Sequence, residues 1–380
     1  MVKCERCGCE DLKYFGNNNG KLYCRRCILF KGEIAKSSIN NHVEIVQPFL
    51  RYPLSIEQDK ISKEILDGFI NRKNIFLHAV CGAGKTELVY RTIAYCLSNN
   101  LQVGFCIPRR DVVIELAPRI QEAFPTKKIV SVYGGNTTYL QGDVIVLTSH
   151  QLYRYIHYFD FLIMDETDAF PFANNDVLWD MFFRSIRGNY LLMSATPFNY
   201  MIDKIRKEGG IILKLMKRYH GHPLIVPKVI LTSFFVKFYT IKATQKFVKE
   251  NKPVFIFAPT IVEAKELYSV MKIFIKKGNV VHSKSESRER IIEDFKNGKY
   301  LYLVTTSILE RGVTIKNLQV IVYKADHSFF SDNTLVQISG RVGRKIDSPN
   351  GEVIYIANKE TKEMKDSIEN IKRSNEYAFL

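Results

Sequence analysis

The chain has 380 residues, which exceeds one ordinary hydrophobic core and predicts two main domains plus a small appendage. Hydrophobic residues make up 46% and charged residues 25%, values near the globular average that exclude disordered, collagen-like and low-complexity classes. The formal net charge of +16 favours a polyanionic partner, with nucleic acid ahead of an anionic membrane surface.

The N-terminal segment is charged and lacks the apolar core of a secretory signal. The most apolar stretches have the length of strands and fall well short of the ~20 residues that span a bilayer. We therefore expect no export, only peripheral membrane association, and eight cysteines that remain reduced.

Four N-terminal cysteines form two Cys-x2-Cys pairs whose separation, residues 8–23, fits the spacing of about 15 to 20 residues typical of zinc sites. Two thiolates three positions apart on a tight turn can bind one ion, and so small a segment could hardly fold without it. The alternative is chance clustering of thiols. Cys9 could replace one ligand only at a poorer spacing, so it is left as a spare thiol. We expect residues 1–40 to form a Zn²⁺ module with the ligands Cys4, Cys7, Cys24 and Cys27. Loss of the metal should unfold this module and leave the rest of the chain folded.

Basic side chains surround the cysteine pairs and outnumber the acidic ones. The module could therefore contact nucleic acid, or its basic face could simply offset the charge of four thiolates.

A strand expected over residues 74–78 leads into Ala79-Val80-Cys81-Gly82-Ala83-Gly84-Lys85-Thr86, and a helix is expected over 87–97. Glycines at positions 82 and 84 let backbone N–H groups converge on phosphate oxygens. Lys85 would reach the β and γ phosphates, and Thr86 would hold Mg²⁺. Alanine stands at position 79, where the strict phosphate-binding loop has glycine. The pattern predicts an ATP and Mg²⁺ site; the alternative is an accidental glycine turn.

A second expected strand, residues 161–164, ends in Asp165-Glu166-Thr167-Asp168. Asp165 would hold Mg²⁺, and Glu166 would orient and deprotonate the water that attacks the γ phosphate. The alternative is an acidic loop whose only role is to cap a helix. That role would explain Asp165 but not the acidic residues that follow it.

These motifs, together with Ser194-Ala195-Thr196 after a strand expected over 190–193, resemble motifs I, II and III of superfamily 2 helicases. The resemblance implies an α/β protein with two RecA-like parallel-sheet lobes, residues 41–232 and 233–380, after the zinc module. It also implies that Asp168, Ser194 and Thr196 couple nucleotide to nucleic acid. Gln58 resembles the adenine-reading glutamine of the family, although a glutamine at a helix start can also be a cap.

Further loops match the family at the ends of expected strands, and the resemblance implies that they hold nucleic acid phosphates. The alternative is ordinary loop residues. The expected contacts are Arg109, Thr148, Thr260 and Thr306.

Gln337-Ile338-Ser339-Gly340-Arg341-Val342-Gly343-Arg344 resembles motif VI. In that motif Gln337 would reach the nucleotide site, and Arg341 and Arg344 would act as arginine fingers from the second lobe.

The cysteines, the phosphate loop and three further segments resemble the ComFA family of helicase-like ATPases of natural competence in Gram-positive bacteria; these segments are Asp165 to Pro171, Arg218-Tyr219-His220-Gly221-His222-Pro223 and Leu309-Glu310-Arg311-Gly312-Val313-Thr314. Ile338 and Thr314 depart from RNA-directed helicases, which disfavours RNA remodelling.

The family implies a cytoplasmic, ATP-dependent single-stranded DNA translocase, peripheral at the inner face of the membrane. Its implied partners are a ComFC-type protein and components of the DNA-uptake channel, and a homo-oligomer is compatible with the sequence. The rivals are a nucleotide-switched DNA clamp or assembly factor, and a helicase of another pathway.

The loosely patterned residues 197–253 connect the two expected lobes and are rich in basic side chains. They could line a path for the nucleic acid strand or form a solvated linker. The tail, residues 358–380, is expected to be a charged helix that packs on the second lobe.

Overall fold

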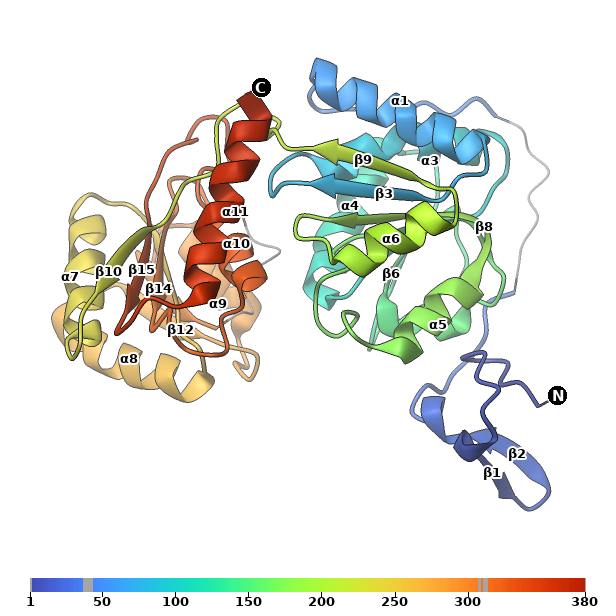
Figure 1. Ribbon diagram of the computed structural model, residues 1–380, viewed down its shortest axis with the longest axis horizontal. Helices are drawn as coiled ribbons and strands as arrows, with labels where there is room; N and C mark the ends of the chain where they lie inside the picture. Colours follow the sequence, from blue (N-terminus) through green and yellow to red (C-terminus); the bar gives the residue numbers. More distant parts are fainter. Residues whose placement is uncertain (1, 37–43, 307–308, 310–313, 380) are drawn as a thin grey trace. The chain divides into compact units, whose positions relative to one another are not determined.

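The computed structural model describes residues 2–36, 44–306, 309 and 314–379, and Figure 1 shows their ribbon. The described part forms two compact units. The first comprises Met1–Ala79 and Gly84–Leu215, and the second comprises Val80–Ala83 and Met216–Leu380. The ComFA-like residues 310–313 lie outside the described ranges.

The first unit contains a parallel sheet with the strand order β5-β6-β4-β7-β8-β3-β9. Because all its strands run in the same direction, the loops that follow them meet at one edge of the sheet, where such folds bind ligands. The strands are β3 (Ile75–Ala79), β4 (Val103–Ile107), β5 (Ile129–Val132), β6 (Val144–Thr148), β7 (Phe159–Met164), β8 (Ile186–Ser194) and β9 (Ile211–Leu215).

Helices cover both faces of this sheet, as Figure 1 shows for α1 and α6 on opposite sides of β3 and β9. Alternate residues of β3 explain this layering, because Phe76 points into the core beneath α5 and α6 while its neighbours are buried on the other face. The helices are α1 (Ile56–Ile70), α2 (Lys85–Leu88), α3 (Tyr90–Ser98), α4 (Arg110–Ala123), α5 (Asp176–Ser185) and α6 (Asn199–Lys207), with the 3-10 helix η3 (Ser149–Arg154).

The N-terminal cysteines lie around a small antiparallel hairpin of β1 (Phe15–Asn18) and β2 (Lys21–Cys24). Two short 3-10 helices flank it, η1 (Leu12–Tyr14) and η2 (Arg25–Cys27). The buried cysteines of this module belong to the same hydrophobic cluster as residues of β7 and η3, so the module shares the core of the first unit.

The second unit contains another parallel sheet, in the order β10-β15-β14-β11-β13-β12. Its strands are β10 (Lys228–Leu231), β11 (Val254–Phe257), β12 (Gly278–Val281), β13 (Tyr302–Thr305), β14 (Gln319–Tyr323) and β15 (Val353–Ala357).

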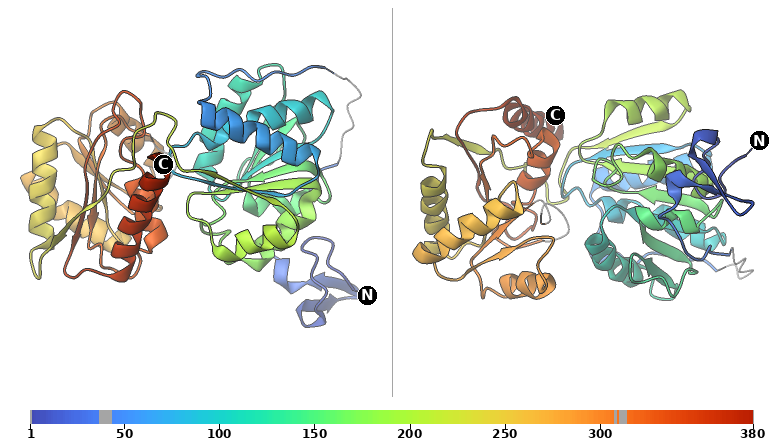
Figure 2. Two further views of the ribbon diagram at one scale, coloured as in Figure 1. Left: turned by 45° about the horizontal axis from the view of Figure 1, so that its top comes forward. Right: turned by 90° about the horizontal axis from the view of Figure 1, so that it is seen from below.

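Two separate hydrophobic clusters cover the two faces of this sheet. One contains residues of α7 and α8, and the other contains residues of α9, α10 and α11; Figure 2 shows α7 and α11 on opposite sides. The helices are α7 (Val236–Lys249), α8 (Ile261–Phe274), α9 (Arg288–Lys296), α10 (Asp332–Ser339) and α11 (Lys362–Phe379).

The two parallel sheets with helices on both faces confirm the predicted α/β architecture. The contacts divide the chain after Leu215 and β10 pairs with β15, whereas the predicted boundary follows residue 232. The helix expected over residues 87–97 is two helices, α2 and α3, which meet at Val89. Along the described ranges, every helix is too short or too polar to cross a membrane.

Candidate nucleotide site and metal centre

The phosphate-binding loop follows β3 and leads into α2. Gly82 has a φ of +82° and Gly84 a φ of +78°, in the left-handed region that side chains disfavour. A Cβ atom on Gly84 would also lie 2.6 Å from the Nε2 atom of Gln58. Glycine at position 84 is therefore required by the backbone conformation, and a Cβ atom there would also displace the end of the Gln58 side chain.

Lys85 and Asp165, the central residues of the predicted site, meet directly. Nζ of Lys85 lies 2.8 Å from Oδ1 of Asp165, and both side chains are mostly buried. The same oxygen accepts a hydrogen bond of 2.8 Å from the backbone N–H of Glu166. Glu166 itself has a φ of +59°, a conformation rare outside glycine and frequent at functional sites. The structure thus brings the predicted lysine and both predicted carboxylates to one edge of the sheet.

Asp168, Ser194 and Thr196 form a hydrogen-bonded network. Oγ of Ser194 donates to Oδ1 of Asp168 at 2.7 Å, and Oγ1 of Thr196 donates to Oδ2 at 2.8 Å. The backbone N–H of Thr196 donates to Oγ of Ser194 at 2.9 Å. Both oxygens of one carboxylate are therefore held by the last residue of β8 and by Thr196 just after it, and hydrogen bonds to a charged acceptor are among the stronger ones in proteins.

His78 is a neighbour that sequence reasoning missed. It lies in β3, and its Nε2 atom is 3.2 Å from the carbonyl oxygen of Ala195, between the two hydroxyl residues of the network. Burial lowers the pKa of His78, with the nearby Lys214 and Lys85 acting in the same direction. A polar residue inside an otherwise apolar strand was the available signal.

Gln58 has two structural roles. It completes a capping box at the start of α1, where its Oε1 atom accepts from the N–H of Ser55 at 2.9 Å. Its amide nitrogen lies beside Gly84 of the phosphate loop. The capping role is therefore real, and adenine reading by the same side chain stays a prediction.

The predicted nucleic acid contacts lie at the carboxyl ends of parallel strands in each unit. In the first unit, Ile107 of β4 is in register with Thr148 of β6, so the loop of Arg109 and Thr148 share an edge. In the second unit, Phe257 and Thr305 are in register, which brings the segments of Thr260 and Thr306 together.

These threonines are not freely presented. Oγ1 of Thr260 caps α8 by accepting from the N–H of Glu263 at 3.2 Å, and Thr148 and Thr306 are buried. Backbone N–H groups of the same loops are thus better candidates for phosphate contacts than the threonine hydroxyls. The side-chain assignments remain predictions.

The residues resembling motif VI belong to α10 and the loop after it. Gln337 and Arg341 are buried, and Nε of Arg344 donates to the carbonyl oxygen of Gly340 at 3.1 Å.

The four predicted zinc ligands form one cluster. The Sγ atoms of Cys4, Cys7, Cys24 and Cys27 all lie within 4.8 Å of one another. The distances between Sγ atoms are 3.5 Å for Cys4 and Cys27 and 3.7 Å for Cys7 and Cys24. Tetrahedral zinc with Zn–S bonds of about 2.3 Å requires sulfur separations of about 3.8 Å. A disulfide would bring the two sulfurs to about 2.05 Å, so the spacing fits a metal centre rather than disulfides.

The surroundings of the cluster also fit a metal ion. Burial raises the pKa of the Cys7 thiol to about 12, so a divalent cation would have to displace the proton of this thiol to bind. The turn after Cys4 is closed by a 2.8 Å bond from the N–H of Gly8 to the Cys4 carbonyl oxygen, and Gly8 has a φ of +69°. Cys9 lies outside the cluster, with its Sγ atom 3.9 Å from the carbonyl oxygen of Asp11.

The cysteine module is anchored on the first unit, in contrast to the expected independent appendage. Arg26 forms an ion pair with Asp180 of α5, and Nε of Arg184 donates to the carbonyl oxygen of Glu5. The ring of Phe30 stacks on His150 of η3 with a centroid distance of 6.1 Å. Loss of metal should therefore affect more than the module.

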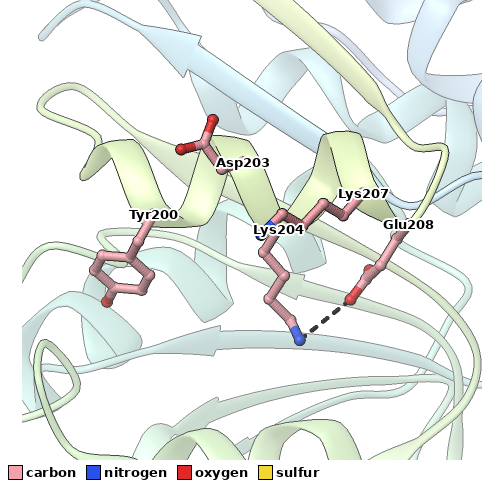
Figure 3. A pocket seen from close by; sticks show the side chains of 5 residues that line it. All are labelled: Tyr200, Asp203, Lys204, Lys207 and Glu208. Atoms are coloured by element: carbon pink, nitrogen blue, oxygen red, sulfur yellow. Dashed lines mark ion pairs between the residues drawn. The ribbon is translucent and has the colours of Figure 1, made fainter.

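A shallow hollow of about 480 Å³ lies along α6 (Figure 3). Its lining comes from one helix and its end, with an ion pair of 3.2 Å between Lys204 and Glu208. As the structure describes it, the hollow contains none of the predicted nucleotide-binding residues. We assign it no role in the chemistry.

Two helicase family models match this chain. The DEAD/DEAH box helicase family matches residues 56–204, and the helicase conserved C-terminal domain family matches residues 239–345. A solved structure of a Dbp5 variant from S. cerevisiae bound to RNA and ADP BeF3 has a TM-score of 0.67 and 18% identity, over 86% of this chain and 93% of that chain. This likeness shows that the two sheets are RecA-like lobes.

Two relatives match almost the whole chain. Competence protein ComFA of Streptococcus pneumoniae (strain ATCC BAA-255 / R6) is 32% identical over 99% of this chain and 91% of its own length. Competence protein ComFA of Bacillus subtilis (strain 168) is 32% identical over 99% of this chain and 86% of its own length. The chain therefore belongs to the ComFA family of competence proteins, within the DEAD/DEAH group of superfamily 2 helicases.

Proposed function

We propose that this protein is an ATP-dependent single-stranded DNA translocase that drives DNA uptake during natural competence. The observation that carries the proposal is the pair of networks in the first lobe, Lys85 with Asp165 and Asp168 with the hydroxyls of Ser194 and Thr196. Through Asp168, the acidic loop of the nucleotide site is hydrogen-bonded to the segment of Ser194 and Thr196. A change at the nucleotide could therefore be passed to that segment. Membership of the ComFA family supplies the biological setting.

ATP hydrolysis is assigned to the loops after β3 and β7. Thr86 and Asp165 are the residues that would hold Mg²⁺, which polarises the phosphates when bound. Lys85 would exchange its carboxylate partner for phosphate oxygens. Glu166 would orient and deprotonate the attacking water. Gln337, Arg341 and Arg344 of the second lobe would complete the site, with the arginines stabilising charge that develops in the transition state.

Movement along DNA requires that one binding surface holds the DNA while another releases it. Each lobe offers such a surface at the carboxyl ends of its parallel β-strands. The loops of Arg109 and Thr148 form one edge, and those of Thr260 and Thr306 form the other. Backbone contacts to phosphate are independent of sequence, which suits uptake of arbitrary DNA, and the net charge of +16 favours such binding.

The setting follows from the family resemblance: cytoplasmic, peripheral at the inner face of the membrane, with a ComFC-type protein and the uptake channel as partners. Self-association would be compatible with this role. The competing function is a nucleotide-switched clamp or assembly factor, which would use the same sites without moving. A helicase of another pathway is the third candidate.

The length of single-stranded DNA separates these functions. A translocase should show ATP turnover at saturating DNA that rises with strand length, because each binding event supports more steps. A clamp should reach its plateau as soon as its footprint is filled. The assay measures turnover over a series of strand lengths at fixed salt, together with displacement of a tightly bound roadblock.

A flat series without displacement would favour the clamp. Stronger stimulation by RNA than by DNA would contradict the competence assignment. Duplex DNA and RNA of matched length serve as controls.

A further inference from the structure

Arg218 is a buried arginine in the connector between β9 and β10, with only 3% of its surface exposed. Its guanidinium donates to three backbone carbonyl oxygens beyond the end of α10. Nη1 donates to Val342 at 3.0 Å and to Gly343 at 2.9 Å, and Nη2 donates to Gly340 at 3.2 Å. The partners are carbonyl oxygens rather than carboxylates, so this arginine organises backbone and does not neutralise an acid.

The two residues after Arg218 bind the same loop. Oη of Tyr219 donates to the carbonyl oxygen of Arg344 at 3.3 Å, and Nε2 of His220 lies 2.9 Å from the carbonyl oxygen of Gly343. The segment Arg218–His220 therefore reaches four carbonyl oxygens of the loop 340–344. These carbonyls flank or belong to both arginines that we assign to hydrolysis.

The conformation of this loop is closely determined. Gly343 has a φ of +67°, and a Cβ atom at that position would lie 2.2 Å from the carbonyl oxygen of Pro349. The carbonyls at the end of a helix lack intrahelical partners and carry partial negative charge. A rigid guanidinium fork can satisfy several such oxygens at once, which an ammonium group cannot do with the same geometry.

The charge of Arg218 comes at an energetic cost. Burial lowers the pKa of Arg218 to about 10, and the nearby positive charge of Arg344 acts in the same direction. A neutral donor would cap a helix without that penalty. Retaining a buried cation beside another cation indicates that the exact fork geometry matters to the loop.

We propose that Arg218 is a positioning residue for ATP hydrolysis, which fixes the loop 340–344 so that Arg341 and Arg344 project correctly. The inference rests on the proposed function in one respect, the role of these two arginines. The connector begins directly after β9, and β9 pairs with β3, the strand that leads into the phosphate loop. Arg218 thus follows the end of β9 by three residues and reaches the arginine-bearing loop through its hydrogen bonds.

The test compares Arg218→Lys, Arg218→Gln and Arg218→Ala in the full chain, with and without single-stranded DNA. We expect kcat for ATP to fall by roughly 10- to 100-fold, the size of effect produced by about 1 Å of misplacement of a catalytic group. Binding of a fluorescent ATP analogue should weaken less than kcat falls, because the hydrogen bond from Nε of Arg218 to the phosphate loop goes to the carbonyl oxygen of Cys81, at 3.2 Å, and not to Lys85 or Thr86. Methylguanidinium should partly restore kcat to Arg218→Ala and leave Arg218→Gln unchanged.

Two further variants make the result interpretable. Arg206→Ala removes an exposed arginine paired with Asp203 on α6 and should leave kcat unchanged. Arg344→Ala tests the proposed role of the arginine itself, with an expected loss of about 10³ to 10⁵ in kcat.

If Arg344→Ala loses activity but the Arg218 variants keep their kcat, the positioning role is wrong and the proposed function stands. If Arg344→Ala is fully active, the arginine assignment in the proposed function fails. Equal loss of analogue binding, kcat and thermal stability in the Arg218 variants, with no rescue by methylguanidinium, would reduce Arg218 to a general folding role and overturn the inference.

Discussion

Removal of zinc should destabilise the whole first lobe, and the structure allows the size of the effect to be worked out. The segment that follows the cysteines is bound to η3 by three hydrogen bonds. All three acceptors are backbone carbonyl oxygens: Oη of Tyr153 donates to that of Lys31 at 2.6 Å, Nη1 of Arg154 to that of Glu33 at 2.8 Å, and the N–H of Ala35 to that of Arg154 at 2.8 Å. The rings of Phe30 and Tyr153 also pack with centroids 5.9 Å apart.

A net contribution of about 1 kcal/mol for each hydrogen bond and about 1 kcal/mol for the aromatic pair gives about 4 kcal/mol. Part of the segment should stay attached without metal, so we expect a loss of about 2 to 4 kcal/mol. For a lobe of this size, each kcal/mol lowers Tm by about 2 to 4 °C. The first lobe should therefore melt about 4 to 16 °C lower.

The assay is scanning calorimetry of the full chain before and after chelation, and of Cys24→Ser and Cys27→Ser, with zinc content measured in each sample. Cys9→Ser is the matched control, because Cys9 lies in the same module but outside the sulfur cluster. It should retain one zinc per chain. An unchanged transition of the first lobe after complete metal loss would refute the coupling. Protein without zinc at any stage would refute the metal assignment itself.

The remaining predictions concern the motor. Lys85→Ala should weaken nucleotide binding, whereas Glu166→Gln should retain binding and lose turnover, measured by analogue titration and steady-state hydrolysis. Normal turnover in the Glu166 variant would reassign the base. Thr196→Val should reduce DNA stimulation of turnover more than basal turnover, because it removes one of the two hydroxyl donors to Asp168; an equal reduction of both rates would argue against coupling. Single-stranded DNA affinity should fall steeply with salt, and a shallow dependence in a binding titration would contradict phosphate-dominated contacts.

The local motifs could be predicted from the sequence because their geometry is set by neighbouring residues. The glycines at positions 82 and 84 can adopt a left-handed backbone conformation, and both have a positive φ in the structure. The Cys-x2-Cys pairs predict a cluster because each pair already presents two thiols on one turn, and the four sulfurs do converge. The strand expected over residues 161–164 ends at the same residue as β7, Met164, because the apolar run stops at Asp165.

Other features depended on pairing between distant segments, which local patterns do not encode. The predicted boundary assigns β10 to the first lobe because this strand is only four residues long, and its pairing with β15 in the second sheet joins residues more than 120 positions apart. The anchoring of the cysteine module on α5 and η3 joins residues more than 100 positions apart and was not foreseen.

The sequence by itself determined the family, the two-lobe α/β class, the nucleotide loop, the acidic motif and the cysteine cluster. The tertiary structure alone decided that both oxygens of Asp168 are held by Ser194 and Thr196, that His78 contacts Ala195, and that Arg218 holds the arginine loop. The reason is that such contacts depend on the register of parallel strands and on the course of the connector. These are set by packing across the whole sheet and cannot be read from any single segment.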